Sequence, residues 1–289
     1  MLIDTGKLLA HARQNKYAVG GFNIYNLEGT RAVLSAAEEM DSPAILQMLP
    51  SALAIGGSGL IAMCLELAKK STVPVAVHLD HCSSSEGIAF ALDAGLTSIM
   101  ADGSALSYPD NIAFTQAIVQ KSGPTGGTVE AELGKLSGEE DGWTVADREA
   151  QMTDADQAAD FVDKTGVSAL AVCIGNVHGK YYRPPKLDFA RLGAIAQQVS
   201  IPLVLHGTSG LPDTMITQAI TYGVCKFNVN TEIRNAYIKA LAKNFKNSSK
   251  PELVHLMQES IEAMKVPVQS KIKLFCSAGK AKTINNNWP

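Results

Sequence analysis

The chain has 289 residues, of which 46% are hydrophobic, and its formal net charge is −3. This length supports one large domain, residues 1–289, with a full core, and the nearly balanced charge gives no reason to expect nucleic acid or an anionic membrane as partner. We find no apolar run long enough to span a bilayer. The N-terminal residues lack a signal-peptide pattern, and the five cysteines are scattered without paired spacing. Both features are typical of a cytoplasmic protein with reduced thiols.

Short apolar runs alternate with helical periods along the chain, and no linker rich in Pro, Gly or Ser divides it. The apolar runs predict eight strands, at residues 19–23, 44–48, 74–81, 97–102, 128–132, 169–175, 203–206 and 224–229. The helical periods predict helices at residues 28–40, 59–70, 84–94, 109–121, 154–165, 188–199, 212–222, 232–247, 252–264 and 268–275. Eight strand–helix units followed by extra C-terminal helices predict an α/β protein, a (β/α)8 TIM barrel. A doubly wound open sheet is less favoured, because no early strand is followed by a Gly-x-Gly-x-x-Gly turn.

Three of the predicted strands deliver a histidine at their carboxyl ends. His81 ends the third strand, the sixth apolar run stops at His178, and His206 ends the seventh strand. The carboxyl ends of barrel strands share one rim, so these three side chains suit a tetrahedral Zn²⁺ with one open position. The alternative for any one of them is a hydrogen-bonded core or rim histidine. His78, which lies deeper in the third strand, is interpreted as structural.

Acidic residues follow the fourth and fifth predicted strands. Asp102 and Glu132 suit either a second metal position or outer carboxylates that orient the histidines. A solvated carboxylate at a strand end is the alternative for each. The long loop at 132–143 has glycines on both sides of an acidic triplet, which suggests a mobile flap that carries a carboxylate. A disordered acidic surface loop is the alternative.

A glycine-rich turn at 207–210 and the segment Asn-Val-Asn-Thr at 228–231 stand at the ends of the last two predicted strands. Barrels commonly bind a phosphate at this place. Backbone N–H groups in a tight turn, a serine hydroxyl and a helix N-terminus suit a dianion, and Gly179 after the sixth strand can join them. Plain turn formation remains an alternative for the glycines, and N-capping remains one for Ser209 and Thr231.

Eight short motifs occur in order along nearly the whole chain. They are Gly-Phe-Asn-Ile-Tyr-Asn from Gly21, His-Leu-Asp-His from His78, Asp-Gly-Ser from Asp102, Glu-Ala-Glu-Leu-Gly from Glu130, Gly-Glu-Glu-Asp-Gly from Gly138, Gly-Asn-Val-His-Gly from Gly175, His-Gly-Thr-Ser-Gly from His206 and Phe-Asn-Val-Asn-Thr from Phe227. With these motifs the chain resembles the class II, metal-dependent ketose-bisphosphate aldolases of the fructose and tagatose type, and it is nearest to the tagatose-type branch. The resemblance implies a (β/α)8 fold, assembled as a homodimer or homotetramer. It also implies reversible retro-aldol cleavage of a ketose 1-phosphate or 1,6-bisphosphate to dihydroxyacetone phosphate and an aldehyde.

The same resemblance implies a role for each matching residue. The implied ligands of the catalytic Zn²⁺ are His81, His178 and His206. The residues implied to hold the metal in an alternative location are Asp102 and Glu132. The implied proton-transfer residues are Asp80, at the substrate hydroxyl, and Glu140, at the carbon centre. The implied binding site for dihydroxyacetone phosphate comprises Asn23, Gly179, Gly207, Thr208, Ser209, Asn228, Val229, Asn230 and Thr231. In these enzymes a monovalent cation, Na⁺ or K⁺, often assists near the phosphate.

The chain departs from the family pattern where bisphosphate-cleaving members bind the distal phosphate. Leu49 stands at the position of a serine, with Ser51 two residues further on, and Glu252 stands where an arginine would be. A glutamate repels a phosphate, so the same chemistry on a non-bisphosphate or longer sugar 1-phosphate is one alternative. A non-catalytic aldolase-like subunit, a Schiff-base aldolase that uses Lys226, and a metal-dependent sugar-phosphate epimerase or isomerase also remain open.

Overall fold

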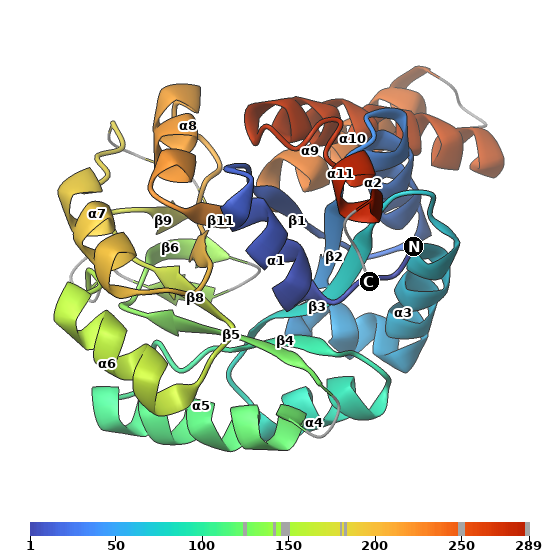
Figure 1. The fold of residues 1–289 in the computed structure, drawn as a ribbon. Coiled ribbons are helices and arrows are strands. Elements are labelled where there is room, and N and C mark those ends of the chain that lie inside the picture. The colour runs from blue at the N-terminus through green and yellow to red at the C-terminus, as the bar shows by residue number, and fades with distance from the viewer. Residues whose placement is uncertain are drawn as a thin grey trace.

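The computed structural model describes residues 1–123, 126–140, 143–145, 151–179, 181, 184–247 and 252–286. Of residues 137–140, 143–145, 247 and 285–286 it describes the backbone alone. Within these ranges the chain forms a closed barrel of parallel strands surrounded by helices (Figure 1). The predicted TIM barrel is therefore confirmed, and the open doubly wound sheet is excluded because the first strand pairs with the last barrel strand.

The order of strands around the barrel is β1-β11-β10-β8-β5-β4-β3-β2. The bounds of these strands are β1 Val19–Asn23, β2 Ala44–Met48, β3 Val75–Cys82, β4 Ser98–Ala101, β5 Thr128–Leu133, β8 Ala169–Val172, β10 Leu203–Leu205 and β11 Val224–Val229. The predicted ranges 19–23, 44–48 and 224–229 are confirmed, and the other predicted strands differ at their ends. Strands with runs of buried residues on both faces, as in β1, β2 and β11, are typical of a parallel sheet covered by helices.

Helices follow the barrel strands as predicted. They are α2 Leu27–Glu39, α3 Pro50–Lys70, α4 Ser85–Asp93, α5 Tyr108–Ser122, α6 Ala155–Thr165, α7 Phe189–Gln198, α8 Asp213–Thr221 and α9 Thr231–Asn247. The largest difference from the prediction is in α3, which begins at Pro50 rather than at Gly59. Proline at the first helical position favours this early start, and the helix is interrupted by non-helical backbone at Gly57.

A helix before the first strand, α1 (Thr5–Gln14), closes the amino end of the barrel. Its side chains Leu8 and Leu9 are fully buried in one cluster with the barrel-interior residues Ile45 and Val204. The segment before and within α1 is tied to the first residues of two strands, since Ile3 N donates to the Val75 carbonyl and Gly6 N donates to the hydroxyl of Thr128. The opposite, carboxyl end of the barrel therefore remains for the site.

The C-terminal region forms one long helix, α10 (Leu253–Leu274), where two helices were predicted, and then a short α11 (Ala281–Asn286). The prediction was wrong because α10 continues through Pro267. A proline inside a helix removes one backbone hydrogen bond. Burial of Met264 and Val268 on either side of the proline, where α10 packs against α2 and α9, compensates for that loss. Figure 1 shows these helices together on one side of the barrel.

The loop predicted to be a flap contains regular structure. Two short strands, β6 (Ser137–Glu140) and β7 (Trp143–Val145), pair antiparallel, and β6 also pairs parallel with β9 (Val177–His178). The prediction that the sixth barrel strand delivers His178 at its carboxyl end was wrong, because this strand, β8, ends at Val172. His178 instead belongs to this small three-stranded sheet beside the barrel.

The prediction that no apolar run is long enough to span a bilayer was wrong for helix α3. By length and composition alone it is apolar enough to cross a membrane, the one such helix among the described residues. Its place in the fold gives another reason for this composition, because Leu60, Ile61 and Cys64 are buried and α3 packs against β2 and β3. A helix on the outside of a barrel needs such an apolar face.

Candidate active site

Three histidines from different parts of the chain meet at the carboxyl end of the barrel. His81 lies near the end of β3, His178 ends β9, and His206 directly follows β10. The ring centroids of His81 and His206 are 4.5 Å apart, and those of His81 and His178 are 5.0 Å apart. One ligand atom from each ring lies within 4.8 Å of the others. This spacing allows all three to contact one ion.

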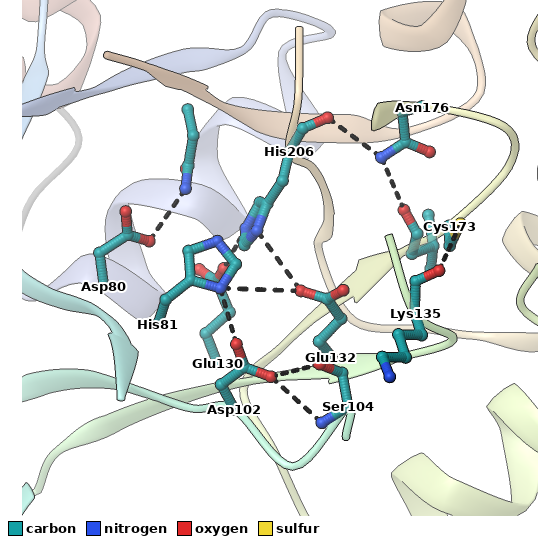
Figure 2. A network of polar contacts seen from close by, with 12 residues as sticks. Asp80, His81, Asp102, Ser104, Glu130, Glu132, Lys135, Cys173, Asn176 and His206 are labelled. Atoms are coloured by element: carbon teal, nitrogen blue, oxygen red, sulfur yellow. Dashed lines mark hydrogen bonds and ion pairs between the residues drawn. The ribbon is translucent and has the colours of Figure 1, made fainter. Parts of the chain in front are cut away.

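His81 reaches this position through an irregularity of β3. The register between β3 and β4 shifts between Leu79 and Cys82, and His81 has a φ of 47°. A positive φ at a residue other than glycine costs of order 1 kcal/mol. In a regular strand consecutive side chains point to opposite faces, so the shift is what allows both Asp80 and His81 to face the site, as Figure 2 shows.

Asp102 orients the imidazole of His81. Its Oδ2 accepts a hydrogen bond from His81 Nδ1 at 2.8 Å, and its Oδ1 accepts from the backbone N–H and the hydroxyl of Ser104 at 3.1 and 2.7 Å (Figure 2). Burial raises the pKa of Asp102, but the hydrogen bond from His81 and those from Ser104 hold this pKa well below its usual range. Because a carboxylate only accepts, the proton of His81 lies on Nδ1 and leaves Nε2 for a ligand.

His206 lies between two glutamates of β5. Its Nε2 lies 2.9 Å from Glu130 Oε1, and its Nδ1 lies 3.6 Å from Glu132 Oε2. Glu130 was missed in the sequence analysis, although its spacing of two from Glu132 places both side chains on one face of the strand. The backbone carbonyl of His206 accepts a hydrogen bond from Asn176 Nδ2 at 3.0 Å. Asn176, also missed, ties the segment before His178 to His206 (Figure 2).

The residues around the three histidines fit a metal ion. Burial lowers the pKa of His178 and of His206 well below the usual value, and the neighbouring His81 lowers both further, so their imidazoles are neutral. The Nδ1 of His206 is buried and has no hydrogen-bond partner in the part of the chain that the structure describes. Neutral imidazoles with a buried free lone pair are suitable ligands for a divalent metal. A second group, His81 with Asp102 and Glu132, also brings its ligand atoms within 4.8 Å.

Asp80 is held beside the histidines by three side-chain amides. Its Oδ2 accepts from Asn23 Nδ2 at 3.0 Å and from Gln47 Nε2 at 2.9 Å, and its Oδ1 accepts from Asn228 Nδ2 at 2.9 Å. Asp80 is fully buried. The donors come from β1, β2 and β11, which fix the carboxylate from three directions. Gln47 was not predicted as a site residue; its pairing with Asn23 in the β1–β2 register is what brings it there.

The loops after β10 and β11 lie against each other and against the segment around His178. The hydroxyl of Thr208 donates to the Asn228 carbonyl at 2.9 Å, and the Tyr181 hydroxyl donates to the Gly207 carbonyl at 2.8 Å. The same Tyr181 oxygen accepts from the backbone N–H of Val177 at 3.1 Å. The predicted phosphate-binding turns are therefore neighbours in space.

Side chains in these turns have partners within the protein. The hydroxyl of Ser209 donates to Glu232 Oε2 at 2.5 Å, and Asn230 Oδ1 accepts from the Tyr25 hydroxyl at 3.0 Å. Thr231 is the first residue of α9, and Val229 ends β11. Gly179 has a φ of 77° directly after His178.

Glu140 ends β6, and its side chain lies outside the described part of the structure. The backbone of β6 is nevertheless placed, since Gly138 pairs with His178. The acidic segment is thus attached to the strand that carries one of the three histidines.

Comparison with known proteins agrees with this geometry. The family model described as class II fructose-bisphosphate aldolase matches residues 3–280. The D-tagatose-1,6-bisphosphate aldolase subunit GatY of Klebsiella oxytoca is 41% identical over 281 residues, which cover 96% of this chain and 99% of the relative. The crystal structure of the YdjI aldolase from Escherichia coli K12 is 38% identical with a TM-score of 0.88, covering 97% of this chain and 100% of that one.

A more distant structure shares the fold alone. The fructose-bisphosphate aldolase Fba of Campylobacter jejuni is 21% identical with a TM-score of 0.78, covering 96% of this chain and 97% of that one. From the family match, the relative at 41% identity and the converging histidines, the chain belongs to the class II fructose-bisphosphate aldolase family and is an aldolase.

Proposed function

We propose that this aldolase cleaves the C3–C4 bond of an open-chain ketose 1-phosphate or 1,6-bisphosphate of the fructose or tagatose type. The products are dihydroxyacetone phosphate and an aldehyde. The observation that carries the proposal is the position of Asp80, a buried carboxylate fixed by three amides beside three convergent histidines. A base beside a metal-binding group is the arrangement that a retro-aldol reaction needs.

His81, His178 and His206 are the proposed ligands of Zn²⁺, and Asp102 and Glu132 are the proposed residues for its alternative location. When bound, the ion supplies Lewis-acid polarisation of the substrate's ketone oxygen. The protein's part is to present the imidazoles at fixed positions, and the hydrogen bond from His81 to Asp102 supports this.

Asp80 is the proposed base. Its carboxylate takes the proton of the C4 hydroxyl, the C3–C4 bond breaks, and its electron pair remains on C3 while the aldehyde leaves. Glu140 then gives a proton to C3, which completes dihydroxyacetone phosphate. The pairing of β6 with the strand of His178 supports this second role, because it attaches the segment of Glu140 to the metal-binding group.

The proposed phosphate site combines the end of β1, the residue after β9, the loop after β10, and the end of β11 with the residues that follow it. Its residues are Asn23, Gly179, Gly207, Thr208, Ser209, Asn228, Val229, Asn230 and Thr231. The hydrogen bonds from Thr208 to the Asn228 carbonyl and from Ser209 to Glu232 link the loop after β10 to β11 and to the start of α9, which supports one shared site. The N-terminus of α9 at Thr231 adds a favourable dipole for a dianion. A bound Na⁺ or K⁺ near the phosphate is part of the proposal.

We also propose which kind of distal end the substrate carries. The relative GatY is named for tagatose 1,6-bisphosphate, but Leu49, buried at the start of α3, offers no donor to a phosphate. Glu252 caps α10 by accepting from the backbone N–H of His255 at 2.9 Å. These two residues favour a substrate whose distal end is uncharged or longer, with the dihydroxyacetone phosphate half unchanged.

A panel of ketose 1-phosphates and 1,6-bisphosphates, assayed for release of dihydroxyacetone phosphate with and without chelator, tests both points. We expect cleavage that chelator abolishes and zinc restores, and a higher kcat/KM for substrates without a distal phosphate. Zinc binding without turnover of any substrate would support a non-catalytic subunit instead. A strong preference for fructose or tagatose 1,6-bisphosphate would refute the proposal for the distal end.

The Schiff-base alternative is disfavoured by the position of Lys226. This side chain is fully buried, and its Nζ lies 2.9 Å from Glu130 Oε2. An amine held in an ion pair inside the barrel cannot reach a substrate carbonyl at the rim. Borohydride treatment in the presence of substrate is therefore expected to leave activity unchanged, and inactivation would revive this alternative.

We also propose that the protein is a cytoplasmic homodimer or homotetramer. Large apolar side chains are exposed where α9 ends and α10 begins: Phe245 is 61%, Leu253 68% and Val254 57% exposed. Such a surface suits contact with a second copy. Light scattering after size-exclusion chromatography should give a mass above the 30.6 kDa of one chain, and the Phe245→Asp variant should lower it. A monomeric wild-type protein would contradict this proposal.

A further inference from the structure

The barrel interior contains a buried ion pair that the proposed reaction does not use. Lys226 Nζ lies 2.9 Å from Glu130 Oε2 and 3.2 Å from Glu130 Oε1, and the two residues are 0% and 1% exposed. Lys226 comes from β11 and Glu130 from β5, which are separated in the barrel by β10 and β8. The pair therefore reaches across the interior of the barrel.

The neighbouring strand leaves room for this pair. A Cβ atom added to Gly21 of β1 would lie 3.1 Å from Lys226 Cε and 2.2 Å from Gln47 Oε1. A larger residue at Gly21 would displace both side chains. Burial of two charges is costly even when they are paired, so a buried pair is weak evidence for a purely stabilising role.

Glu130 connects this pair to one of the proposed metal ligands. Its Oε1 lies 2.9 Å from His206 Nε2. A carboxylate accepts and does not donate, so the proton of a neutral His206 lies on Nε2 and the lone pair lies on Nδ1. That Nδ1 is the buried atom of His206 that has no hydrogen-bond partner among the described residues.

We propose that Glu130 is a positioning residue that fixes His206 in the tautomer with Nε2 protonated, so that Nδ1 faces the metal. Lys226 is the counter-ion that allows a carboxylate to do this inside the barrel. Metal-bound histidines commonly donate their second N–H to a carboxylate in this way. His78 does not compete for the same oxygen, because its Nε2 lies 3.8 Å from Glu130 Oε2 and its Nδ1 is bonded to the Ser98 hydroxyl at 2.7 Å. The inference rests on His206 being a metal ligand, as proposed above.

Nitrogen NMR of the wild-type protein tests the tautomer directly. The chain has six histidines, so ¹⁵N-histidine labelling gives few signals, and the His206→Asn variant assigns the one of interest. We expect His206 to carry its proton on Nε2 both without metal and with Zn²⁺, and Nδ1 to shift when Zn²⁺ is added. Zinc on Nε2 of His206, or a proton on Nδ1 in the metal-free protein, would overturn the inference. A wild-type protein that binds no zinc would instead overturn the proposed function.

A matched pair of double variants separates positioning from stabilisation. Glu130→Gln with Lys226→Met keeps an oxygen that accepts from His206, whereas Glu130→Leu with Lys226→Met removes it, and neither leaves an unpaired buried charge. Zinc affinity, measured by competition with a chromogenic chelator, should be roughly 10- to 100-fold weaker in the leucine variant than in the glutamine variant. Equal zinc affinity in two variants of similar thermal stability would overturn the inference. The NMR experiment decides the question whether or not the leucine variant folds.

Discussion

Asp102 and Asp80, two carboxylates near the three histidines, are held by different kinds of donor. Asp102 accepts from His81, whereas the donors to Asp80 among the described residues are the amides of Asn23, Gln47 and Asn228. An amide does not compete for the proton that a base must take up. This difference fits the proposed roles, in which Asp80 acts on the substrate hydroxyl and Asp102 orients His81.

This difference predicts that substitutions at the adjacent residues Asp80 and His81 lower activity in two different ways. Asp80→Asn removes the proposed base, so kcat should fall roughly 10²- to 10⁴-fold while zinc content stays at the wild-type level. His81→Ala removes a proposed metal ligand, so zinc content and activity should be lost together. Metal analysis and steady-state kinetics on both variants distinguish these outcomes. An Asp80→Asn variant that loses its zinc would show that Asp80 belongs to the metal-binding group instead.

The ion pair between Lys271 and Glu232 predicts a dependence of stability on pH. Burial raises the pKa of Glu232, but the Lys271 ammonium, 2.9 Å away, and the Ser209 hydroxyl hold it below the usual value. A carboxylate whose pKa is lower in the folded state adds stability above its unfolded pKa of about 4.3, and this is lost as pH falls through the folded pKa.

Lys271→Met should therefore lower the free energy of unfolding by about 1 kcal/mol at neutral pH and by less at about pH 3. Urea unfolding of wild type and variant at both pH values measures the difference. The exposed pair of Lys70 and Glu66, also 2.9 Å apart, provides the control, since Lys70→Met should change stability little. A Lys271→Met effect of equal size at both pH values would argue against the ion pair as its source.

The residues that sequence reasoning found and those that it missed differ in what surrounds them in the sequence. His81, Asp102 and Glu132 stand at or next to strand ends, where a polar side chain after an apolar run is conspicuous. Glu130 lies further inside β5, and Gln47 stands between Leu46 and Met48 within an apolar run. A polar residue would not normally be expected at such places in a barrel core. Only the packing of the strands shows that Glu130 is paired with Lys226 and that Gln47 is bonded to Asp80.

At the scale of whole elements, the turn after β10 depends on a glycine. Gly207 has a φ of 61°, and a Cβ atom there would lie 2.2 Å from the carbonyl oxygen of Val177. The turn thus packs its backbone against the strand of His178. Any larger residue would push apart two segments that carry proposed metal and phosphate contacts.

Gly207→Ala is expected to raise KM for the phosphorylated substrate. It is also expected to lower the free energy of unfolding by more than the backbone strain of alanine at a positive φ would lower it. Gly166→Ala provides the matched control, because Gly166 has a similar φ of 69° with nothing within 4 Å of an added Cβ. That control should cost about 1 kcal/mol and leave KM unchanged. Kinetics and urea unfolding give both quantities, and equal effects of the two substitutions would show that the contact with Val177 does not matter.

The ends of helices and strands were predictable from the sequence where the local hydrophobic pattern agrees with the packing in the folded protein. All residues of β1, β2 and β11 are buried, and the predicted ranges of these three strands are confirmed. The hairpin of β6 and β7 was missed because the residues of β6 are polar or glycine and β6 is paired with His178 of a distant segment. The break predicted at Pro267 was wrong because packing of α10 on α2 and α9 outweighs a local helix breaker.

At the scale of the whole molecule, the barrel topology was predictable because serial strand–helix units leave few ways to bury both faces of a parallel sheet. Closure then brings together histidines that stand far apart along the chain, at positions 81, 178 and 206. An unfolded chain cannot hold three ligands in this arrangement. Any ion that binds them therefore binds the native state and stabilises the entire barrel.

Removal of the metal should accordingly lower the melting temperature as well as the activity. With free zinc at a thousand times its Kd, binding adds about 4 kcal/mol to the free energy of unfolding, which for a domain of this size corresponds to roughly 7 °C. Differential scanning calorimetry of zinc-loaded, chelated and refilled protein measures the shift. His206→Ala serves as the control, because its melting temperature should respond little to zinc. If chelated protein is shown by metal analysis to be zinc-free and still melts at the same temperature as the loaded form, the three histidines do not hold a metal in the folded protein.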